Sequence, residues 1–261
     1  MIDCRRMKRR LFACIFSLAI AAPAMAAESA SPDTWLWAWQ RNEDLSNLTR
    51  NPIGIAYLAQ TITLRDGRLL LAPRDKSLRV PPHAVLMPVT RIEVSRAHSE
   101  PLTDEQASKV ADAVVNTLSS HTIGVQIDFD ARQSERPFYL KLLNETKRKL
   151  PTGAKLSMTA LASWCLFDTW LERAPVDEVV PMFFSMGADT ESVLNYLKEG
   201  RPLCARCRSS LGVSCDQPAI ANTVLHSKSA SQRTSTYIFT SKPWSTLSLR
   251  SAFALLVPLR P

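Results

Sequence analysis

Glycine is scarce in this chain, which has 7 glycines and 17 prolines among its 261 residues. No two glycines stand one residue apart, and neither the GxGxxG fingerprint of dinucleotide-binding folds nor a Walker phosphate loop occurs. The sequence also lacks an HExxH helix and a serine nucleophile elbow, and its four histidines do not have the spacing of metal ligands. We therefore expect neither a nucleotide-binding fold, nor a cofactor, nor a bound metal ion.

Long apolar runs are missing after the first 26 residues, which have the pattern of a secretory signal peptide. Five basic residues between positions 5 and 10 precede a short apolar run at 11–22, and Ala24, Met25 and Ala26 form a small-residue cleavage site. The apolar run is too short to span a bilayer. We predict a signal peptide at 1–26, a single mature domain at 27–261, and a periplasmic or secreted location.

The net charge of the chain depends on this segment. The formal net charge is +8, but the first 26 residues contain five basic residues and Asp3, so cleavage lowers it to +4. The mature chain has no basic stripe with interleaved aromatic residues and no apolar segment long enough to span a membrane. We therefore expect no nucleic-acid partner and no membrane span after cleavage. We also expect a monomer.

Four cysteines remain after signal cleavage, namely Cys165, Cys204, Cys207 and Cys215. In an oxidising compartment they are expected to form structural disulfide bonds, and four thiols allow three connectivities. Cys204 and Cys207 form a CxxC motif, for which a redox or zinc-binding role is the alternative.

Strands alternate with helices along the mature chain. Period-two alternation and apolar runs predict strands at 34–41, 55–64, 69–72, 85–95, 124–131, 155–162, 178–187, 211–214 and 237–240. Helical patterns predict helices from Thr103, at 134–150, 166–173 and 190–199, and from Trp244, whereas 222–236 is predicted to be a long loop. This order is typical of an irregular (β/α)8 TIM-like barrel with an N-terminal β-hairpin insertion and some short or missing helices. A doubly wound open sheet is the alternative.

The chemistry is concentrated on the strand at 124–131, whose sequence is GVQIDFDA. Alternation places Gln126, Asp128 and Asp130 on one face, which points into the interior of a barrel. Buried carboxylates are costly unless they are compensated, and active sites of such barrels lie at the carboxyl ends of the strands. Two carboxylates this close raise each other's proton affinity, so one acid can stay protonated near neutral pH. A structural aspartate pair held by arginine or backbone donors is the alternative.

Aromatic residues at other strand ends suggest a sugar-binding surface. Trp37, Trp39 and Arg41 share one face of the first strand, so Trp39 and Arg41 are expected at the barrel mouth. Indole rings beside carboxylates suit the apolar face of a sugar ring. We predict a substrate-binding set made of Gln126, Trp37, Trp39, Arg41, Arg91 and Trp164.

The segment at 124–130 resembles the fourth-strand motif of family 18 glycoside hydrolases, G-x-D-x-D-W-E. This resemblance implies that Asp130 is the general acid and Asp128 its supporting aspartate. Gln126 stands where the motif has an aspartate, and Asp130 is one methylene shorter than the expected glutamate. The segments WAWQR, VQIDFDAR, LSMTALASWC, PVDEVVPMFFSMG and CRSSLGVSCD resemble, in this order, an uncharacterised bacterial exported family with a domain of unknown function. That second resemblance implies a glycoside-hydrolase-like barrel without an assigned substrate.

Three hypotheses of function follow. The first is an enzyme that cleaves a glycosidic bond in a cell-envelope glycan or other polysaccharide, with Asp130 as acid and a nucleophile supplied by the substrate or water. The second is a non-catalytic glycan-binding or cell-envelope protein on a degenerate hydrolase barrel. The third is a thiol-active protein that uses Cys204 and Cys207.

Overall fold

The computed structural model describes residues 32–95 and 101–257, within a compact unit that runs from Ser31 to Pro261. The predicted signal peptide at 1–26 lies outside the described residues, and its cleavage stays a prediction. Among the described residues, no helix combines the length and the apolar character needed to cross a membrane.

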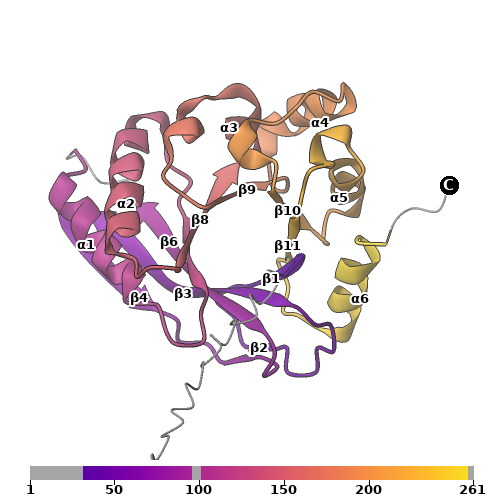
Figure 1. Cartoon of the computed structure of the whole chain (residues 1–261), viewed down its shortest axis with the longest axis horizontal. Coiled ribbons are helices and arrows are strands. Elements are labelled where there is room, and N and C mark those ends of the chain that lie inside the picture. Colours follow the sequence, from indigo (N-terminus) through magenta and orange to yellow (C-terminus); the bar gives the residue numbers. More distant parts are fainter. Residues whose placement is uncertain (1–31, 96–100, 258–261) are drawn as a thin grey trace, which may run out of the picture. The chain divides into compact units, whose positions relative to one another are not determined.

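Eight parallel strands form a closed barrel, which Figure 1 shows in a view down its axis. They are β1 (Thr34–Ala38), β3 (Gly54–Arg65), β6 (Val85–Val94), β7 (Gly124–Asp128), β8 (Lys155–Leu161), β9 (Glu178–Met182), β10 (Ser210–Ser214) and β11 (Ser235–Phe239). The first strand, β1, pairs with β11 on one side and with β3 on the other, and this double pairing closes the sheet. The predicted TIM-like barrel is confirmed, and the open doubly wound sheet is excluded.

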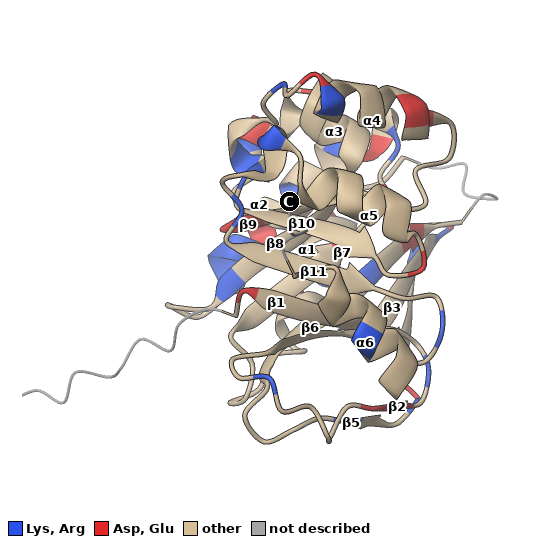
Figure 2. Cartoon of the chain, turned by 90° about the vertical axis from the view of Figure 1, so that its right-hand side faces the viewer, with Lys and Arg blue, Asp and Glu red and all other residues tan. Residues whose placement is uncertain are grey.

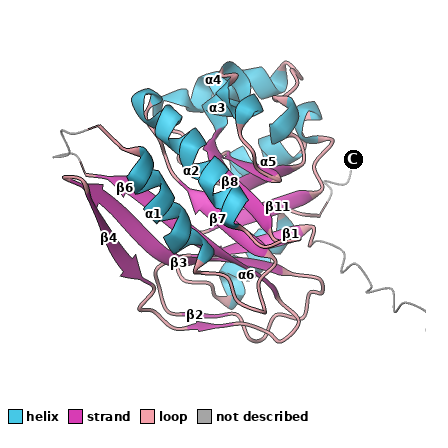
Figure 3. Cartoon of the chain, turned by 60° about the vertical axis from the view of Figure 1, so that its left-hand side comes forward, coloured by secondary structure: helices cyan, strands magenta, loops and turns pink. Residues whose placement is uncertain are grey.

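Helices cover the outside of the barrel from β6 onwards, one after each strand (Figure 3). They are α1 (Asp104–Val115), α2 (Arg136–Lys149), α3 (Ala162–Phe167), α4 (Thr190–Lys198), α5 (Pro218–Leu225) and α6 (Thr246–Ala254). In the described part of the chain no helix follows β1 or β3. Instead β4 (Arg68–Pro73) folds back antiparallel on β3, and β2 (Glu43–Asp44) pairs with β5 (Leu78–Arg79). The predicted hairpin is therefore confirmed, and so is the prediction that some helices of a regular barrel are absent from the described residues.

Two apolar cores stabilise the fold. The larger core lies between strands and helices, where Ile127 of β7 and Leu142 of α2 are fully buried. The smaller core fills the barrel and contains Trp37 and Tyr237, whose ring centroids lie 5.1 Å apart. Gly212 of β10 makes room for this indole, because a Cβ atom there would lie 2.7 Å from the Trp37 ring. The Trp37 ring therefore depends on the glycine at position 212 for its place inside the barrel.

Several predicted element boundaries are wrong, most of them at the carboxyl ends of strands. The predicted strands at 34–41, 124–131 and 178–187 end at Ala38, Asp128 and Met182. In each case the sequence pattern does not mark the end of the strand, whereas backbone pairing with a neighbouring strand stops at these residues.

The predicted loop at 222–236 is also wrong, because its first residues belong to α5. Pro218 occupies the first turn of α5, where its missing N–H group costs nothing, and Ala221 and Val224 lie on the buried face. The Ser- and Thr-rich composition of the whole segment concealed this short apolar stripe.

One disulfide bond joins Cys165 of α3 to Cys207. This finding confirms the prediction of a structural disulfide and identifies Cys165 and Cys207 as its two cysteines. Cys204 and Cys215 are free thiols, each of them half-buried.

Candidate active site

A cavity of about 440 Å³ opens at the carboxyl ends of the barrel strands. Its lining comprises Trp37, Trp39, Arg91, Asp128, Asp130, Thr159, Leu161, Ala162, Ser163, Met182, Phe184, Ser185, Met186, Asp189 and Phe239. This end of a parallel barrel is where active sites of the fold are built. Figure 2 shows that few residues of the strands are charged. Charged residues are seldom buried unless they are paired, so the charged residues in the barrel mouth are candidates for a functional role.

Asp128 lies inside the barrel at the end of β7 and is only 2% exposed. Its Oδ1 accepts a hydrogen bond from the Thr159 hydroxyl at 2.7 Å, and its Oδ2 accepts one from Arg91 Nη1 at 2.8 Å. A buried carboxylate is stable when opposite charge and hydrogen bonds replace its hydration. The side chains of β6 and β8 thus hold a negative charge beneath the cavity.

Asp130 follows β7 by two residues and stands at the cavity wall with 46% of its side chain exposed. Burial raises the pKa of Asp130 from 3.8 to about 6, and the neighbouring Asp128 carboxylate adds to the rise, while Arg91 opposes it. A carboxyl group with this pKa is partly protonated near neutral pH. It can therefore donate a proton, which an ordinary aspartate cannot do at that pH.

Arg91 of β6 links the acidic groups of the site. Its Nη1 binds Asp128, its Nε donates to Glu93 Oε1 at 2.9 Å, and its Nη2 is 3.9 Å from Asp130 Oδ2. The guanidinium carbon also lies 5.9 Å from the centre of the Trp39 ring. Burial acts to lower the pKa of Arg91, but the carboxylates of Asp128 and Glu93 outweigh it and raise that pKa. Arg91 is therefore a permanent cation at the base of the wall.

Gln126 lies below the cavity and holds one of its aromatic walls in place. Its Oε1 accepts a hydrogen bond from Trp37 Nε1 at 2.8 Å, and its Nε2 donates to Ser157 Oγ at 3.0 Å. The Ser157 hydroxyl in turn donates to Glu178, which also accepts a hydrogen bond from Tyr237. Gln126 is fully buried, so it reaches the cavity only through the Trp37 indole.

An apolar wall lies across the cavity from the carboxylates. Phe184 and Phe239 stack with ring centroids 5.0 Å apart, and Trp39 meets Phe239 edge to face at 6.2 Å. Met182 and Met186 complete this wall. An aromatic face opposite an acid is an arrangement that suits the apolar face of a sugar ring.

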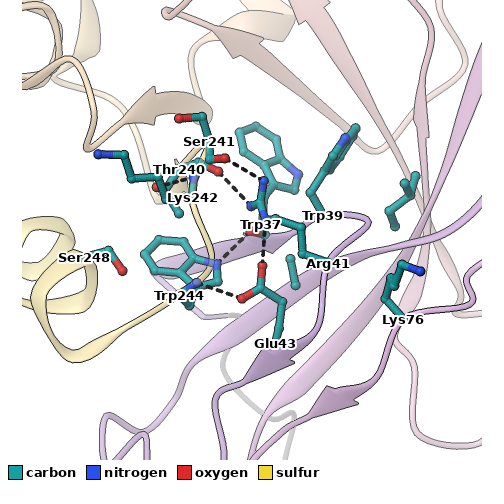
Figure 4. A network of polar contacts seen from close by, with 12 residues as sticks. Trp37, Trp39, Arg41, Glu43, Lys76, Thr240, Ser241, Lys242, Trp244 and Ser248 are labelled. Carbon is teal, nitrogen blue, oxygen red and sulfur yellow. Dashed lines mark hydrogen bonds and ion pairs between the residues drawn. The ribbon is translucent and has the colours of Figure 1, made fainter.

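Arg41 does not line the cavity. It lies beyond the end of β1, where its guanidinium donates to the carbonyl oxygens of Thr240 and Ser241 at 2.9 and 3.0 Å and pairs with Glu43 (Figure 4). Glu43 also accepts a hydrogen bond from the backbone N–H of Trp244. Because the strand ends at Ala38, alternation no longer decides where Arg41 points. Its role is to fasten β1 to the segment after β11.

Trp164 is likewise outside the cavity lining. It belongs to α3 and is 4% exposed, with its ring 5.1 Å from that of Trp170 and 5.8 Å from the Arg136 guanidinium carbon. The predicted strand at 155–162 gives way to a helix at Ala162, and this turn directs Trp164 into the outer core. The adjacent Ser163 lines the cavity instead.

Other members of the site were not among the residues predicted to bind substrate. Thr159 fixes Asp128, and Phe184 and Phe239 form the aromatic wall. Phe184 shares the alternating pattern of Met182 and Met186, but a strand facing a barrel interior has the same pattern whether it fills the core or lines a cavity. Phe239 is the last residue of a short strand, and nothing in the sequence marks it.

Comparison with solved structures shows where this barrel recurs. The chain resembles the catalytic domain of a family 18 chitinase from the fern Peteris ryukyuensis, with a TM-score of 0.53 and 12% identity over 85% of this chain and 99% of that chain. An endo-beta-N-acetylglucosaminidase from Cordyceps militaris is also similar, with a TM-score of 0.46 and 11% identity over 85% of this chain and 89% of that chain. At these identities the likeness concerns the fold alone. No protein-family profile and no curated protein matches the sequence.

Proposed function

We propose that this chain is an exported enzyme that hydrolyses a glycosidic bond, with Asp130 as its general acid. One observation carries the proposal, namely that Asp130, with a pKa of about 6, stands half-exposed beside the buried Asp128 in a cavity with indole walls. Two neighbouring carboxyl groups, one of which has a raised pKa and can donate a proton, are typical of glycosidases. The barrel that the chain shares with a fern chitinase supports the same reaction class.

In this mechanism Asp130 protonates the oxygen of the scissile bond as the leaving sugar departs. Asp128, held by Arg91 and Thr159, stabilises the positive charge that develops on the sugar ring. Both oxygens of Asp128 are engaged by these donors, so we assign the nucleophile to water or to a group of the substrate. Trp39 and Trp37 hold the sugar ring against the acid.

The proposed substrate is a polysaccharide of the cell envelope or of the surroundings. Export rests on the predicted signal peptide at 1–26, and the enzyme is proposed to act as a monomer in the periplasm or outside the cell. No metal ion or cofactor takes part in the proposed steps.

The test is a comparison of the mature wild-type chain with Asp130→Asn on a panel of soluble glycans. The panel starts with β-linked N-acetylglucosamine oligomers, because a chitinase shares the fold, and continues with cell-wall glycan fragments. We expect the wild type to release reducing ends from one substrate, and Asp130→Asn to lose about 100-fold or more of that rate. Glu105→Gln, at an exposed position of α1, serves as the matched control and keeps full activity. Equal turnover by Asp130→Asn would remove Asp130 from the mechanism.

A non-catalytic glycan-binding protein is the second candidate, and the position of Gln126 favours it. Both ends of this amide are engaged by Trp37 and Ser157, so the side chain is not free to assist a reaction. This candidate predicts glycan binding without turnover. Binding would survive Asp130→Asn and weaken about tenfold or more in Trp39→Ala, because stacking area is lost. Isothermal titration with the same oligosaccharides separates the two candidates.

A further inference from the structure

Three sulfur atoms lie together behind the cavity wall. Cys165 and Cys207 form the disulfide bond, and the Sγ atom of the free Cys204 lies 2.7 Å from the Cys207 Sγ atom. All three Sγ atoms lie within 4.8 Å of one another. The backbone N–H of Cys204 donates to the carbonyl oxygen of Cys165 at 2.9 Å, which holds the two segments side by side. A free thiol is thus kept at a disulfide by the backbone as well as by the side chains.

The three residues differ in their access to solvent. Cys165 is 2% exposed and Cys207 is fully buried, whereas Cys204 is only half-buried. A thiol or oxidant in solution therefore reaches Cys204 more easily than it reaches the buried disulfide.

We propose that Cys165, Cys204 and Cys207 form a thiol–disulfide exchange site in which Cys204 is the attacking thiol. Cys204 gives up its proton, and the thiolate attacks the Cys207 Sγ atom. The Cys204–Cys207 bond forms as the Cys165–Cys207 bond breaks, and Cys165 leaves as a thiolate that takes up a proton. One disulfide and one free thiol are present before and after the step, so there is no net oxidation or reduction and neither an oxidant nor a reductant is needed. Its product is a disulfide within the CxxC motif.

The exchange alters what holds the cavity wall. Cys165 lies on α3, and the residues at the start of this helix, Ala162 and Ser163, line the cavity. The Cys165–Cys207 bond ties α3 to the short 3-10 helix Ala205–Cys207, which leads into β10. After exchange this tie is gone, and α3 is held by packing such as that of Trp164 on Trp170. The site therefore sets how firmly one wall of the cavity is fixed, whether or not Asp130 catalyses a reaction.

The surroundings of Cys204 set the pace of the exchange. Burial raises the pKa of its thiol, and the Glu172 carboxylate raises it further. The backbone N–H groups of Cys207 and Arg206 and the charge of Arg208 lower it, without cancelling the rise. Only the thiolate attacks a disulfide, so the exchange is slow at neutral pH. As long as the pH lies below the pKa of Cys204, the rate of exchange increases about tenfold for each unit by which the pH rises.

Disulfide mapping tests the proposal on the intact mature chain, without any glycan. Samples incubated at pH 7 and at pH 9 are quenched in acid and denaturant, and free thiols are trapped with N-ethylmaleimide. Tryptic cleavage after Arg206 separates Cys204 from Cys207, so mass spectrometry distinguishes the two disulfides. We expect Cys165–Cys207 at pH 7, and at pH 9 the appearance of Cys204–Cys207 together with trapped Cys165.

Two cysteine variants provide the controls. Cys204→Ser retains the Cys165–Cys207 bond and is expected to show no trapped Cys165 at pH 9, whereas Cys215→Ser should behave like the wild type. Trapped Cys165 in Cys204→Ser, or its absence from the wild type at pH 9, would overturn the proposal. So would a native mass spectrum showing that added zinc binds the three reduced thiols in place of any disulfide.

Discussion

Arg91 divides its contacts unequally between Asp128 and Asp130, two acidic residues of the cavity lining. Its guanidinium donates to Asp128 at 2.8 Å but remains 3.9 Å from Asp130. The buried aspartate is therefore neutralised by a direct hydrogen-bonded ion pair, while the half-exposed one is only weakly stabilised as an anion. This asymmetry makes Asp130 the group of the pair that can carry a proton, and four predictions follow from it and from the packing beneath it.

The first prediction concerns the pH dependence of turnover. With a pKa of about 6, the Asp130 carboxyl is about 90% protonated at pH 5 and about 10% protonated at pH 7. If the protonated form is the general acid, kcat should fall about tenfold per pH unit above pH 6. The measurement is initial rate against pH between 4.5 and 8 on a substrate that the wild type cleaves. A flat profile across this range would contradict the assignment.

The second prediction concerns the cost of the Asp130 charge to stability. The folded state holds the Asp130 proton more tightly than the unfolded chain, so between pH 3.8 and about 6 the free energy of unfolding falls as pH rises. Asp130→Asn removes the charge that causes this loss of stability, so it should raise the free energy of unfolding at pH 7 by about 1 kcal/mol. This expected gain is smaller than the pKa shift alone would give, because the side chain is half-exposed and solvent screens its charge. Urea denaturation at pH 7 should show the gain, and at pH 3.5 the gain should be absent. Asp189→Asn, at an exposed position of the same cavity, is the matched control.

The third prediction concerns the ion pair beneath Asp130. Arg91→Gln leaves the Asp128 carboxylate buried without its cation, so the free energy of unfolding should fall by about 2 kcal/mol. The loss of the Arg91 charge should also raise the pKa of Asp130, since Arg91 acts to lower it. The alkaline limb of the pH–rate profile, where kcat falls as Asp130 loses its proton, should then move to higher pH. Arg91→Lys retains the charge and should leave the profile closer to that of the wild type.

The fourth prediction tests the packing inside the barrel. In Gly212→Ala the new Cβ atom would lie 2.7 Å from the Trp37 ring, and the free energy of unfolding should fall by about 1–3 kcal/mol. Trp37→Phe makes room for this methyl group. The double variant should therefore lose less stability than the sum of the two single losses, as measured in a double-mutant cycle. If the losses in the free energy of unfolding were additive, the methyl group at position 212 and the Trp37 ring would not compete for the same space.

The sequence predicted the barrel because local patterns and topology agree there. Apolar alternation gives the strands, and helix signals such as the capping box between Thr103 and Gln106 are present as hydrogen bonds in the structure. Gly200 ends α4 with a φ of +68°, as its position after the helix predicts. Asp128, Asp130, Trp37, Trp39 and Arg91 meet at one cavity because the carboxyl ends of parallel strands meet at one edge.

The rest of the site depends on chain direction after the strands, which alternation does not encode. Arg41 and Trp164 follow their strands by only three residues, yet a turn and a helix carry them away from the cavity. Cys165 and Cys207 are 42 residues apart, and only the packing of α3 against the segment before β10 brings them together. Contacts of this kind arise from tertiary structure rather than from local sequence.

The closure of the barrel through β1 and β11 also constrains how the protein folds. The indole N–H of Trp244 donates a hydrogen bond to the carbonyl oxygen of Trp37, although the two residues are 207 positions apart in the sequence. Before β11 is in place, β1 has β3 as a neighbour but lacks β11, and β10 has an open edge. Open strand edges recruit other chains, so the incomplete barrel is exposed to aggregation until β11 pairs. The pairing of β11 with β1 and β10 therefore removes the last open strand edges of the barrel.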